Sequence, residues 1–295
     1  MAAESSAFCP GHVTAFFEPV DHPDSFRKGS RGAGLCLTLG VKSRVKARLG
    51  RTQRIRIYLN RQEVEAPTTR TALERLIGGA AFEVIVQSDV QLPVSQGFGM
   101  SGAGALSAAL AANDAMDLGL SHARVVAIAH AAEVEARTGL GDIVPASQGG
   151  MDLRTEPGAP PHGVVRRIPV IADLVLAVVG PPMPTKTVLA DAARVRAIAA
   201  VGHRCVEAFA KAPSLEELVR LGRSFATETG LAEGKVKAAM DAAAPYGQCS
   251  MAMLGNSVFA VGKVDELDAI FKGLGAQRYR CKVDPKGARL LIPGA

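Results

Sequence analysis

A glycine-rich segment followed by an alanine-rich one constrains this chain more than any other feature. The segment LPVSQGFGMSGAGALSAALAAND, residues 92–114, predicts a flexible loop that leads into a helix over residues 101–117. Glycine lets the backbone approach a ligand closely, and the first turn of a helix presents unpaired N–H groups to an anion. Phosphate binding is therefore one interpretation of the segment. Tight helix packing is the other, because the helix carries the small residues Ala105, Ala108, Ala109 and Ala112.

The context of the glycines argues against two common phosphate loops. The segment contains a G-x-G-x-x-G pattern, but the preceding predicted strand ends near Ser88 and Pro93 interrupts the path to Gly97. A dinucleotide-binding turn needs a strand that runs directly into the first glycine. Asp117 lies twenty positions after Gly97, but between two predicted helices and not after a second strand. A Walker loop is excluded because no Lys-Ser/Thr pair follows the glycines.

The length and composition indicate a globular protein. The 295 residues, 48% hydrophobic and 21% charged, suffice for one large or two ordinary domains. The five cysteines are scattered and form no C-x-x-C pair, which argues against a disulfide framework and a structural zinc site. We find neither a secretory signal nor an apolar run of the roughly 20 residues that a membrane span needs. The sequence therefore predicts a cytoplasmic protein.

The predicted elements come in runs and favour the α+β class. A Pro/Gly-rich stretch at residues 154–163 separates two halves, for which we expect domains at 1–160 and 161–295. The first half predicts strands up to about residue 87 with a short helix at 71–76, and then helices at 101–117 and 121–137. The second half predicts a strand at 167–179, three helices between 191 and 243, two short strands near Met251 and Val258, a helix at 265–274 and a strand at 277–283.

The net charge of +6 is concentrated in one pair of predicted strands. Lys42, Arg44, Lys46 and Arg48 alternate with apolar or small residues, and Arg54 and Arg56 repeat the pattern after Gly50. Period two predicts a basic face and a core face on each strand. A solvated sheet face is the favoured interpretation, and a nucleic-acid surface is the alternative. Only 4% of the residues are aromatic and none is Trp, so platforms for stacking single-stranded bases are few.

Three segments, in order along the chain, resemble motifs of the GHMP kinases. PVSQGFGMSGAGALSAA resembles the family's P-x-x-x-G-L-G-S-S-A phosphate loop, with Ser101 on the second serine and Met100 in place of the first. CPGHVTAFFEP, residues 9–19, is similar to the N-terminal A-P-G-K-V-x-L-x-G-E-H segment, with His12 at the basic position and Glu18 at the glutamate. YGQCSMAMLGNSVFAV, residues 246–261, is a looser match to the C-terminal glycine-rich motif. The resemblance extends over nearly the whole chain.

Four segments resemble the archaeal pantoate kinase branch of this family: GHVTAFFEP, GSRGAG, AEVEARTGLGDIVPASQGGMDLR and TKTVL. The resemblance implies an ATP-binding N-domain like domain 2 of ribosomal protein S5, a ferredoxin-like C-domain, and a homodimer. It also implies ATP-dependent phosphorylation of the 4-hydroxyl of pantoate to 4-phosphopantoate in archaeal coenzyme A biosynthesis. Another hydroxyl acceptor, such as homoserine or mevalonate, and a basic S5-like RNA-binding protein remain open as alternatives.

The resemblance also implies site residues for ATP and Mg²⁺. The nucleotide would contact Pro93, Gly97, Gly99, Met100, Ser101, Gly102 and Ala103. Ser101 would bind Mg²⁺ together with Glu133, whose Ala-Glu pair matches the family. Glu135 flanks the same apolar stripe of its helix on the opposite edge and remains the alternative metal ligand.

Asp142 is the predicted catalytic base, because phosphoryl transfer needs a group that takes the hydroxyl proton. Its alternative is a structural aspartate that caps the next turn. Pantoate is an anion, so Arg31, in the glycine-flanked loop FRKGSRGAG, is predicted to bind its carboxylate, and His12 and Glu18 complete the predicted substrate site. An exposed basic loop and a core histidine are the alternatives for Arg31 and His12.

Overall fold

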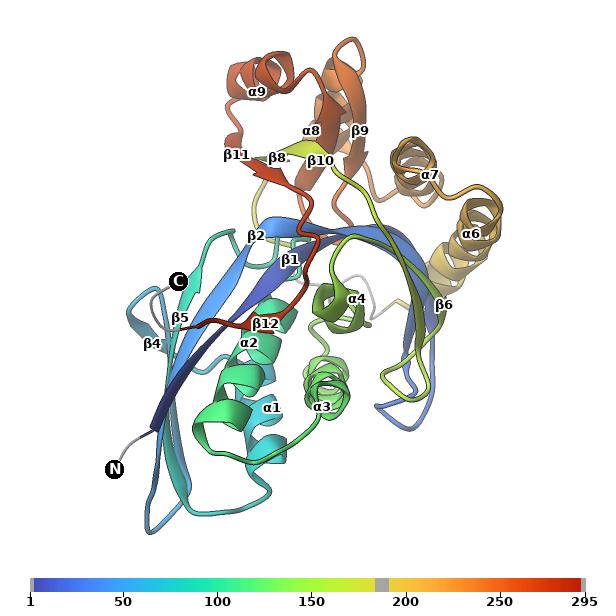
Figure 1. The fold of residues 1–295 in the computed structure, drawn as a ribbon. Coiled ribbons are helices and arrows are strands. Elements are labelled where there is room, and N and C mark those ends of the chain that lie inside the picture. The colour runs from blue at the N-terminus through green and yellow to red at the C-terminus, as the bar shows by residue number, and fades with distance from the viewer. Residues whose placement is uncertain (1–2, 184–190, 293–295) are drawn as a thin grey trace.

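The computed structural model describes residues 3–183 and 191–292. Its strands form two sheets (Figure 1). The larger sheet contains β1 (Ala3–Val20), β2 (Gly29–Leu49), β3 (Arg54–Leu59), β4 (Gln62–Val64), β5 (Phe82–Val90), β6 (Met151–Glu156), β7 (Val164–Ile168) and β12 (Arg289–Leu290). The smaller sheet contains β8 (Asp173–Val178), β9 (Gly247–Met251), β10 (Ser257–Gly262) and β11 (Gln277–Lys282).

The strand orders show how the chain is arranged. The larger sheet has the order β12-β1-β2-β5-β3-β4, and β6 pairs with both β2 and β7. The smaller sheet has the order β11-β8-β10-β9, with antiparallel pairing throughout. Within the described residues, β3 and β5 form the one parallel pair, and helix α1 (Pro67–Ile77) lies between them in sequence. This segregation of strands and helices confirms the predicted α+β class.

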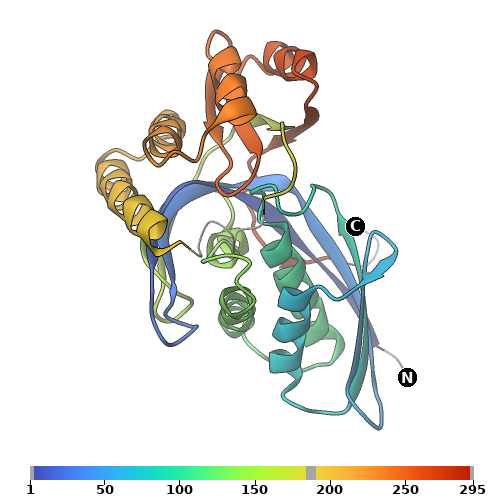
Figure 2. The same cartoon turned by 180° about the vertical axis from the view of Figure 1, so that it is seen from behind.

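The long hairpin β1–β2 arches across the molecule and separates two groups of helices (Figures 1 and 2). On one side lie α1, α2 (Met100–Ala115), α3 (His122–Glu135) and α4 (Ile143–Gln148). On the other side lie the smaller sheet with α8 (Gly234–Ala243) and α9 (Val264–Gly273), while α6 (Ala192–Lys211) and α7 (Leu215–Glu228) flank the far end of the hairpin. Irregular pairing at Pro10/Gly11 and Thr14/Phe16 bends β1.

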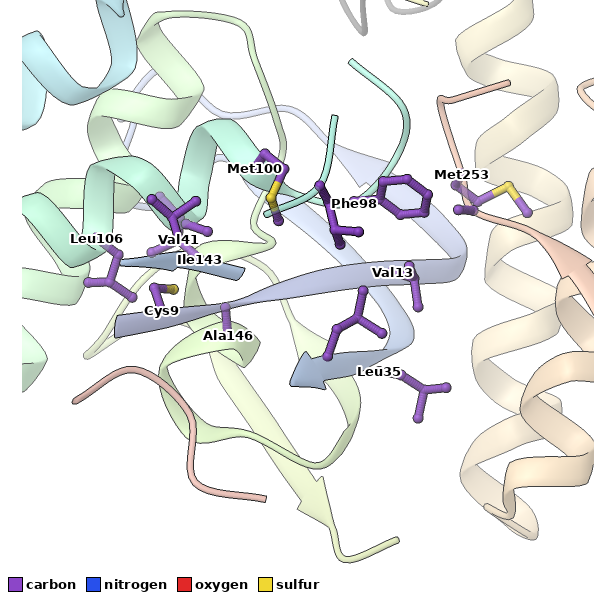
Figure 3. Close-up of a cluster of buried hydrophobic side chains, with 14 of the residues drawn as sticks. Cys9, Val13, Leu35, Val41, Phe98, Met100, Leu106, Ile143, Ala146 and Met253 are labelled. Carbon is purple, nitrogen blue, oxygen red and sulfur yellow. The ribbon is translucent and has the colours of Figure 1, made fainter. Parts of the chain in front are cut away.

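Helix α2 is the centre of the first domain. Its four predicted packing alanines, Ala105, Ala108, Ala109 and Ala112, are all fully buried. Figure 3 shows its residues Met100 and Leu106 in a cluster with Cys9, Val41 and Ile143, which come from β1, β2 and α4. The tight-packing interpretation of the segment is therefore confirmed for the body of the helix.

The basic strands have the predicted two faces. Lys42, Arg44, Lys46 and Arg48 are exposed, and the residues between them are buried. Three of the exposed arginines of these strands pair with acidic neighbours on the same face: Arg44 with Glu4, Arg48 with Glu83, and Arg56 with Glu63. The geometry therefore favours the solvated, charge-paired sheet face over a nucleic-acid surface.

Some elements differ from the prediction. The strand predicted at 167–179 is wrong in extent: it is two strands, β7 in the larger sheet and β8 in the smaller, and Pro169, which cannot donate a ladder hydrogen bond, follows β7. The sequence also failed to predict β6, α4 and β12. Both β7 and β12 lie beyond residue 160 yet pair within the larger sheet. The predicted domain boundary at residue 160 stays a prediction. None of the helices in the described ranges is long and apolar enough to cross a membrane.

Candidate active site

A cavity of about 260 Å³ opens where the first turn of α2 faces the second domain. One wall consists of the glycine-rich loop and the start of α2, and another of the segment that follows α3. Met253 and Leu254 contribute the wall from the second domain. The predicted site residues that line the cavity are Gly97, Gly99, Met100, Ser101, Gly102, Glu133 and Asp142. Pro93 and Ala103 lie outside this lining.

The loop presents the N-terminus of α2 to the cavity. Gly99 is the N-cap and has a φ of 67°, in the left-handed region that favours glycine. The N–H of Ala103 already donates to the carbonyl of Gly99, at 2.9 Å. The N–H groups of the three preceding helical residues, Met100 to Gly102, have no partner within the helix. Such N–H groups, together with the helix dipole, are suited to an anion.

Contacts on both sides of the loop hold it in place. The N–H of His12 donates to the carbonyl of Phe98 at 3.0 Å, which ties the loop to β1. From the second domain, the hydroxyl of Ser257 donates to the carbonyl of Gln96, and the N–H of Met183 donates to the carbonyl of Ser95 at 2.9 Å. Ser257 belongs to the loosely matching segment 246–261, so that segment helps to hold the glycine-rich loop.

Glu133 projects from α3 toward the start of α2. Its carboxylate is 2% exposed and accepts a hydrogen bond from the N–H of Gly141 at 3.1 Å. A Cβ atom at Gly102 would lie 2.7 Å from its Oε1, so only glycine fits there without displacing the carboxylate. Burial, and then the negative charge of Asp142, raise the pKa of Glu133 to about 8.

Glu135 occupies a different environment on the same helix. It accepts hydrogen bonds from Ser25 and Arg75 at the surface and does not line the cavity. The geometry therefore favours Glu133 over Glu135 as the carboxylate beside Ser101. No cluster of three or more metal-ligating side chains exists among residues 3–183 and 191–292. A Mg²⁺ ion held by one or two protein ligands and by substrate phosphates fits this arrangement.

Asp142 lies immediately before α4 and forms part of the cavity wall, with its side chain 31% exposed. It accepts a hydrogen bond from Thr14 Oγ1 at 2.8 Å and pairs with His12 Nδ1 at 3.0 Å. Its side chain makes no capping hydrogen bond to α4, so the helix-capping alternative does not describe its contacts. Burial alone would raise its pKa, but His12, Arg154 and Thr14 lower the pKa of Asp142 to about 2.

A network of buried charged side chains contacts Asp142. His12 is 1% exposed and lies between two aspartates, with Nδ1 on Asp142 and Nε2 at 2.6 Å from Asp152. Burial opposes protonation, but the charges and hydrogen bonds of both aspartates raise the pKa of His12 to about 9. Arg154 Nη1 lies 3.6 Å from Asp142 and 3.8 Å from Asp152. His12 thus contacts Asp142 and does not line the cavity itself.

Sequence reasoning missed three members of this network: Thr14, Asp152 and Arg154. Asp152 and Arg154 are two residues apart on β6, which pairs with β2 at Gly34 and Gly32. Two opposite charges on one face of a short strand, where the predicted interval between the two domains begins, were the available signal. They are both buried, at 1% and 2% exposure.

The remaining predicted substrate residues lie apart from the cavity. Arg31 pairs with Glu18 and Glu207, each at 2.9 Å, and its Nε donates to the carbonyl of Thr155. These contacts link β1 and β2 to α6. Substrate binding by Arg31 and Glu18 stays a prediction, and it requires the acceptor to compete with these ion pairs. The segment TKTVL, residues 185–189, lies outside the described residues.

Replacing Arg31 by Ala separates the two roles. If the guanidinium binds the acceptor carboxylate, the KM for the acceptor rises roughly tenfold or more, as expected for a charge-assisted hydrogen bond, and the KM for ATP stays within twofold. Steady-state kinetics with each substrate varied in turn measures both. An unchanged acceptor KM together with a lower melting temperature assigns Arg31 to holding α6 against the hairpin.

Comparison with known proteins agrees with this geometry. Residues 66–150 match the family described as GHMP kinases N terminal domain. The chain is 35% identical over 270 residues to a pantoate kinase of Thermococcus kodakarensis, with 89% of each chain covered. It is 30% identical over 293 residues to a pantoate kinase of Methanospirillum hungatei, with 97% of this chain and 96% of the relative covered.

Solved structures share the whole fold. A protein described as a phosphotransferase related to the CoA biosynthesis pathway has a TM-score of 0.87 at 30% identity, over 99% of this chain and 100% of the other. A homoserine kinase from Cytophaga hutchinsonii has a TM-score of 0.71 at 16% identity, over 98% of this chain and 97% of the other, which shows a common fold alone. The predicted two-domain GHMP fold is confirmed. The chain belongs to the GHMP kinases, in the branch that contains the archaeal pantoate kinases.

Proposed function

We propose that this protein is a kinase that transfers the terminal phosphate of ATP to the 4-hydroxyl of pantoate, giving 4-phosphopantoate for coenzyme A biosynthesis. The observation that carries the proposal is one cavity that joins a helix N-terminus suited to phosphate with the carboxylates of Glu133 and Asp142. The pantoate kinases that are 30–35% identical over most of the chain support the choice of acceptor.

The first turn of α2 is proposed to bind the phosphates of ATP. Its free N–H groups and dipole stabilise negative charge that develops on the transferred phosphoryl group. Ser101, in the first turn, and Glu133, against it, would hold Mg²⁺, which neutralises the phosphate oxygens when bound. The role that a first serine plays elsewhere in the family is absent here, because Met100 occupies that position.

Asp142 is proposed to orient the acceptor hydroxyl and to take its proton. A carboxylate with a pKa of about 2 is a weak base, so it is ionised throughout the working pH range and accepts the hydroxyl hydrogen bond. The proton then moves late, because the transition state of phosphoryl transfer is loose and makes little demand for early deprotonation. Positioning is therefore the larger share of what Asp142 contributes.

His12 is proposed to position Asp142, and not to bind the acceptor as the sequence predicted. Exchange for Gln leaves Asp142 and Asp152 with Arg154 as their remaining cation. We expect kcat to fall by roughly 10–100-fold, as for other groups that orient an active-site ligand, with the KM for ATP unchanged. A normal kcat in His12→Gln, combined with a raised acceptor KM, would return His12 to substrate binding.

The stability of the same variant depends on pH in a defined direction. The pKa of His12 is raised from 6.5 to about 9 in the fold, so the protonated imidazole stabilises the native state fully below pH 6.5. That contribution is lost as the pH rises through 9. Urea unfolding is expected to show His12→Gln less stable than the wild type by about 3–5 kcal/mol at pH 6, with a smaller difference at pH 9.5.

The proposal is tested by ADP release from ATP and Mg²⁺ with pantoate, homoserine, mevalonate and galactose offered separately. Turnover with pantoate alone supports it, and turnover with another acceptor keeps the kinase and replaces the substrate. The RNA-binding alternative makes a different prediction, because binding through several phosphates collapses between low and moderate salt. The homodimer and the cytoplasmic location stay predictions, and sedimentation of the purified protein tests the first.

A further inference from the structure

Arg137 lies at the mouth of the cavity, two residues after α3. Among the described residues that line the cavity, it is the one with a positive charge, whereas Glu133 and Asp142 are acidic. The phosphate loop itself supplies no lysine, since Met100, Ser101 and Gly102 occupy the helix start. The polyphosphate of a nucleotide carries several negative charges, and enzymes that transfer phosphoryl groups commonly meet them with a fixed cation.

The backbone of Arg137 is in an unfavourable conformation for its residue type. Its φ is 56°, in the left-handed region, at the position just after the C-cap of α3. Glycine is the usual residue at such a position, because any Cβ is crowded there. A non-glycine residue held in this region stores strain, and such strain gathers at functional sites.

The side chain of Arg137 contributes nothing visible to holding this turn. Its backbone N–H donates to the carbonyl of Val134 at 3.1 Å, and the next residue is fixed by Thr138 Oγ1 against Thr68 Oγ1 at 2.8 Å. The guanidinium forms no ion pair or hydrogen bond within residues 3–183 and 191–292, whereas nearby Arg75 is paired with Glu135. A cation on a strained backbone, free of partners and at the mouth of an acidic cavity, is suited to an anionic ligand.

We propose that Arg137 is a nucleotide-binding residue whose guanidinium contacts the phosphate oxygens of bound ATP or ADP. It supplies the positive charge that the glycine-rich loop lacks. The inference rests on the proposed kinase function for the identity of its ligand. The two can fail separately, because ADP binding is measured without any acceptor.

Three substitutions test the proposal: Arg137→Gly, Arg137→Ala and Arg137→Lys. Calorimetry with Mg·ADP gives the nucleotide Kd, steady-state kinetics gives the KM for ATP and for pantoate, and thermal unfolding without ligand gives the melting temperature. Arg124→Ala is the matched control, since Arg124 is an exposed arginine of α3 that stacks over Phe26 and lies outside the cavity.

Arg137→Gly and Arg137→Ala are expected to raise the Kd for Mg·ADP about tenfold, which is the effect of one charge-assisted hydrogen bond. The KM for ATP should rise by a similar factor. Arg137→Lys keeps the charge and recovers part of the affinity. The KM for pantoate and the Arg124→Ala control stay within twofold of the wild type. Arg137→Gly also raises the melting temperature of the free protein, because glycine removes the strained φ.

An unchanged Kd for Mg·ADP in the folded Arg137→Gly variant overturns the proposal. A raised KM for pantoate with normal nucleotide affinity overturns it equally, since it would place the guanidinium on the acceptor. If pantoate proves not to be the acceptor, a weakened Mg·ADP complex in Arg137→Gly still supports the inference.

Discussion

Asp142→Asn lowers kcat by roughly 10²–10⁴, the range for loss of a group that handles the proton in the transition state. The amide keeps an acceptor oxygen for Thr14 Oγ1 but loses the charge that pairs with His12. The KM for ATP is expected to change little, because the proposed phosphate contacts are the N–H groups of α2 and not Asp142. Stopped-flow or coupled ADP assays under saturating ATP and acceptor measure the loss.

A second readout separates catalysis from damage to the site. After burial itself, the negative charge of Asp142 raises the pKa of Glu133. Removing that charge lets Glu133 ionise at lower pH, so Mg·ADP binding in Asp142→Asn should persist to lower pH than in the wild type. Wild-type turnover in this variant removes Asp142 from the mechanism, whereas loss of Mg·ADP binding would assign it to the metal.

Glu133→Gln raises the Mg²⁺ concentration needed for half-maximal activity by roughly 10–100-fold. The amide can still accept the hydrogen bond from Gly141, but it cannot neutralise a divalent cation. Titration of activity with Mg²⁺ at saturating ATP measures the shift. Glu135→Gln is the matched control from the same helix, and its exposed ion pair with Arg75 predicts an unchanged Mg²⁺ requirement. The opposite pattern would exchange the roles of the two glutamates.

Glu133→Gln also alters stability in the absence of metal. The pKa of Glu133 is raised from 4.5 to about 8, so its favourable contribution is full below pH 4.5 and lost as the pH rises through 8. The amide of Gln does not ionise, so the variant does not lose this stability as the pH rises. In chelator, the variant is therefore expected to melt above the wild type at pH 8 and near it at pH 5. Equal melting temperatures of the variant and the wild type at both pH 5 and pH 8 would contradict the burial of the Glu133 carboxylate without a metal ion.

The parts of the site that follow from local sequence were predictable. The glycine-rich loop and α2 are contiguous, and their pattern and capping identify a helix start whatever surrounds it. Likewise, Ser121 caps α3 through a hydrogen bond from the N–H of Arg124, as its residue type indicates. The predicted metal ligand could be narrowed to two glutamates, Glu133 and Glu135. Periodicity places both beside the apolar stripe of their helix, but it does not say what packs against either.

The buried network was not predictable, because its members meet only through long-range pairing. Asp152 and Arg154 reach His12 because β6 pairs with β2 next to β1, and β6 itself was not recognised in a stretch interrupted by glycine and proline. The same applies to β12, a two-residue strand whose register depends on β1. His12 therefore looked like a substrate ligand, since the aspartates that surround it lie 130 and 140 positions away.

The unbroken course of β1 limits how the enzyme can open. The strand carries His12 and Thr14 between its two bends and then packs Phe16 on Phe209 of α6 and Phe17 on Phe225 of α7. These contacts fix one strand of the larger sheet to two helices of the second domain, and so oppose a hinge motion at β1 itself. We therefore expect ATP and acceptor to enter, and products to leave, through movement of the surface loops around the cavity. Turnover would then follow the stiffness of those loops more closely than that of the sheet.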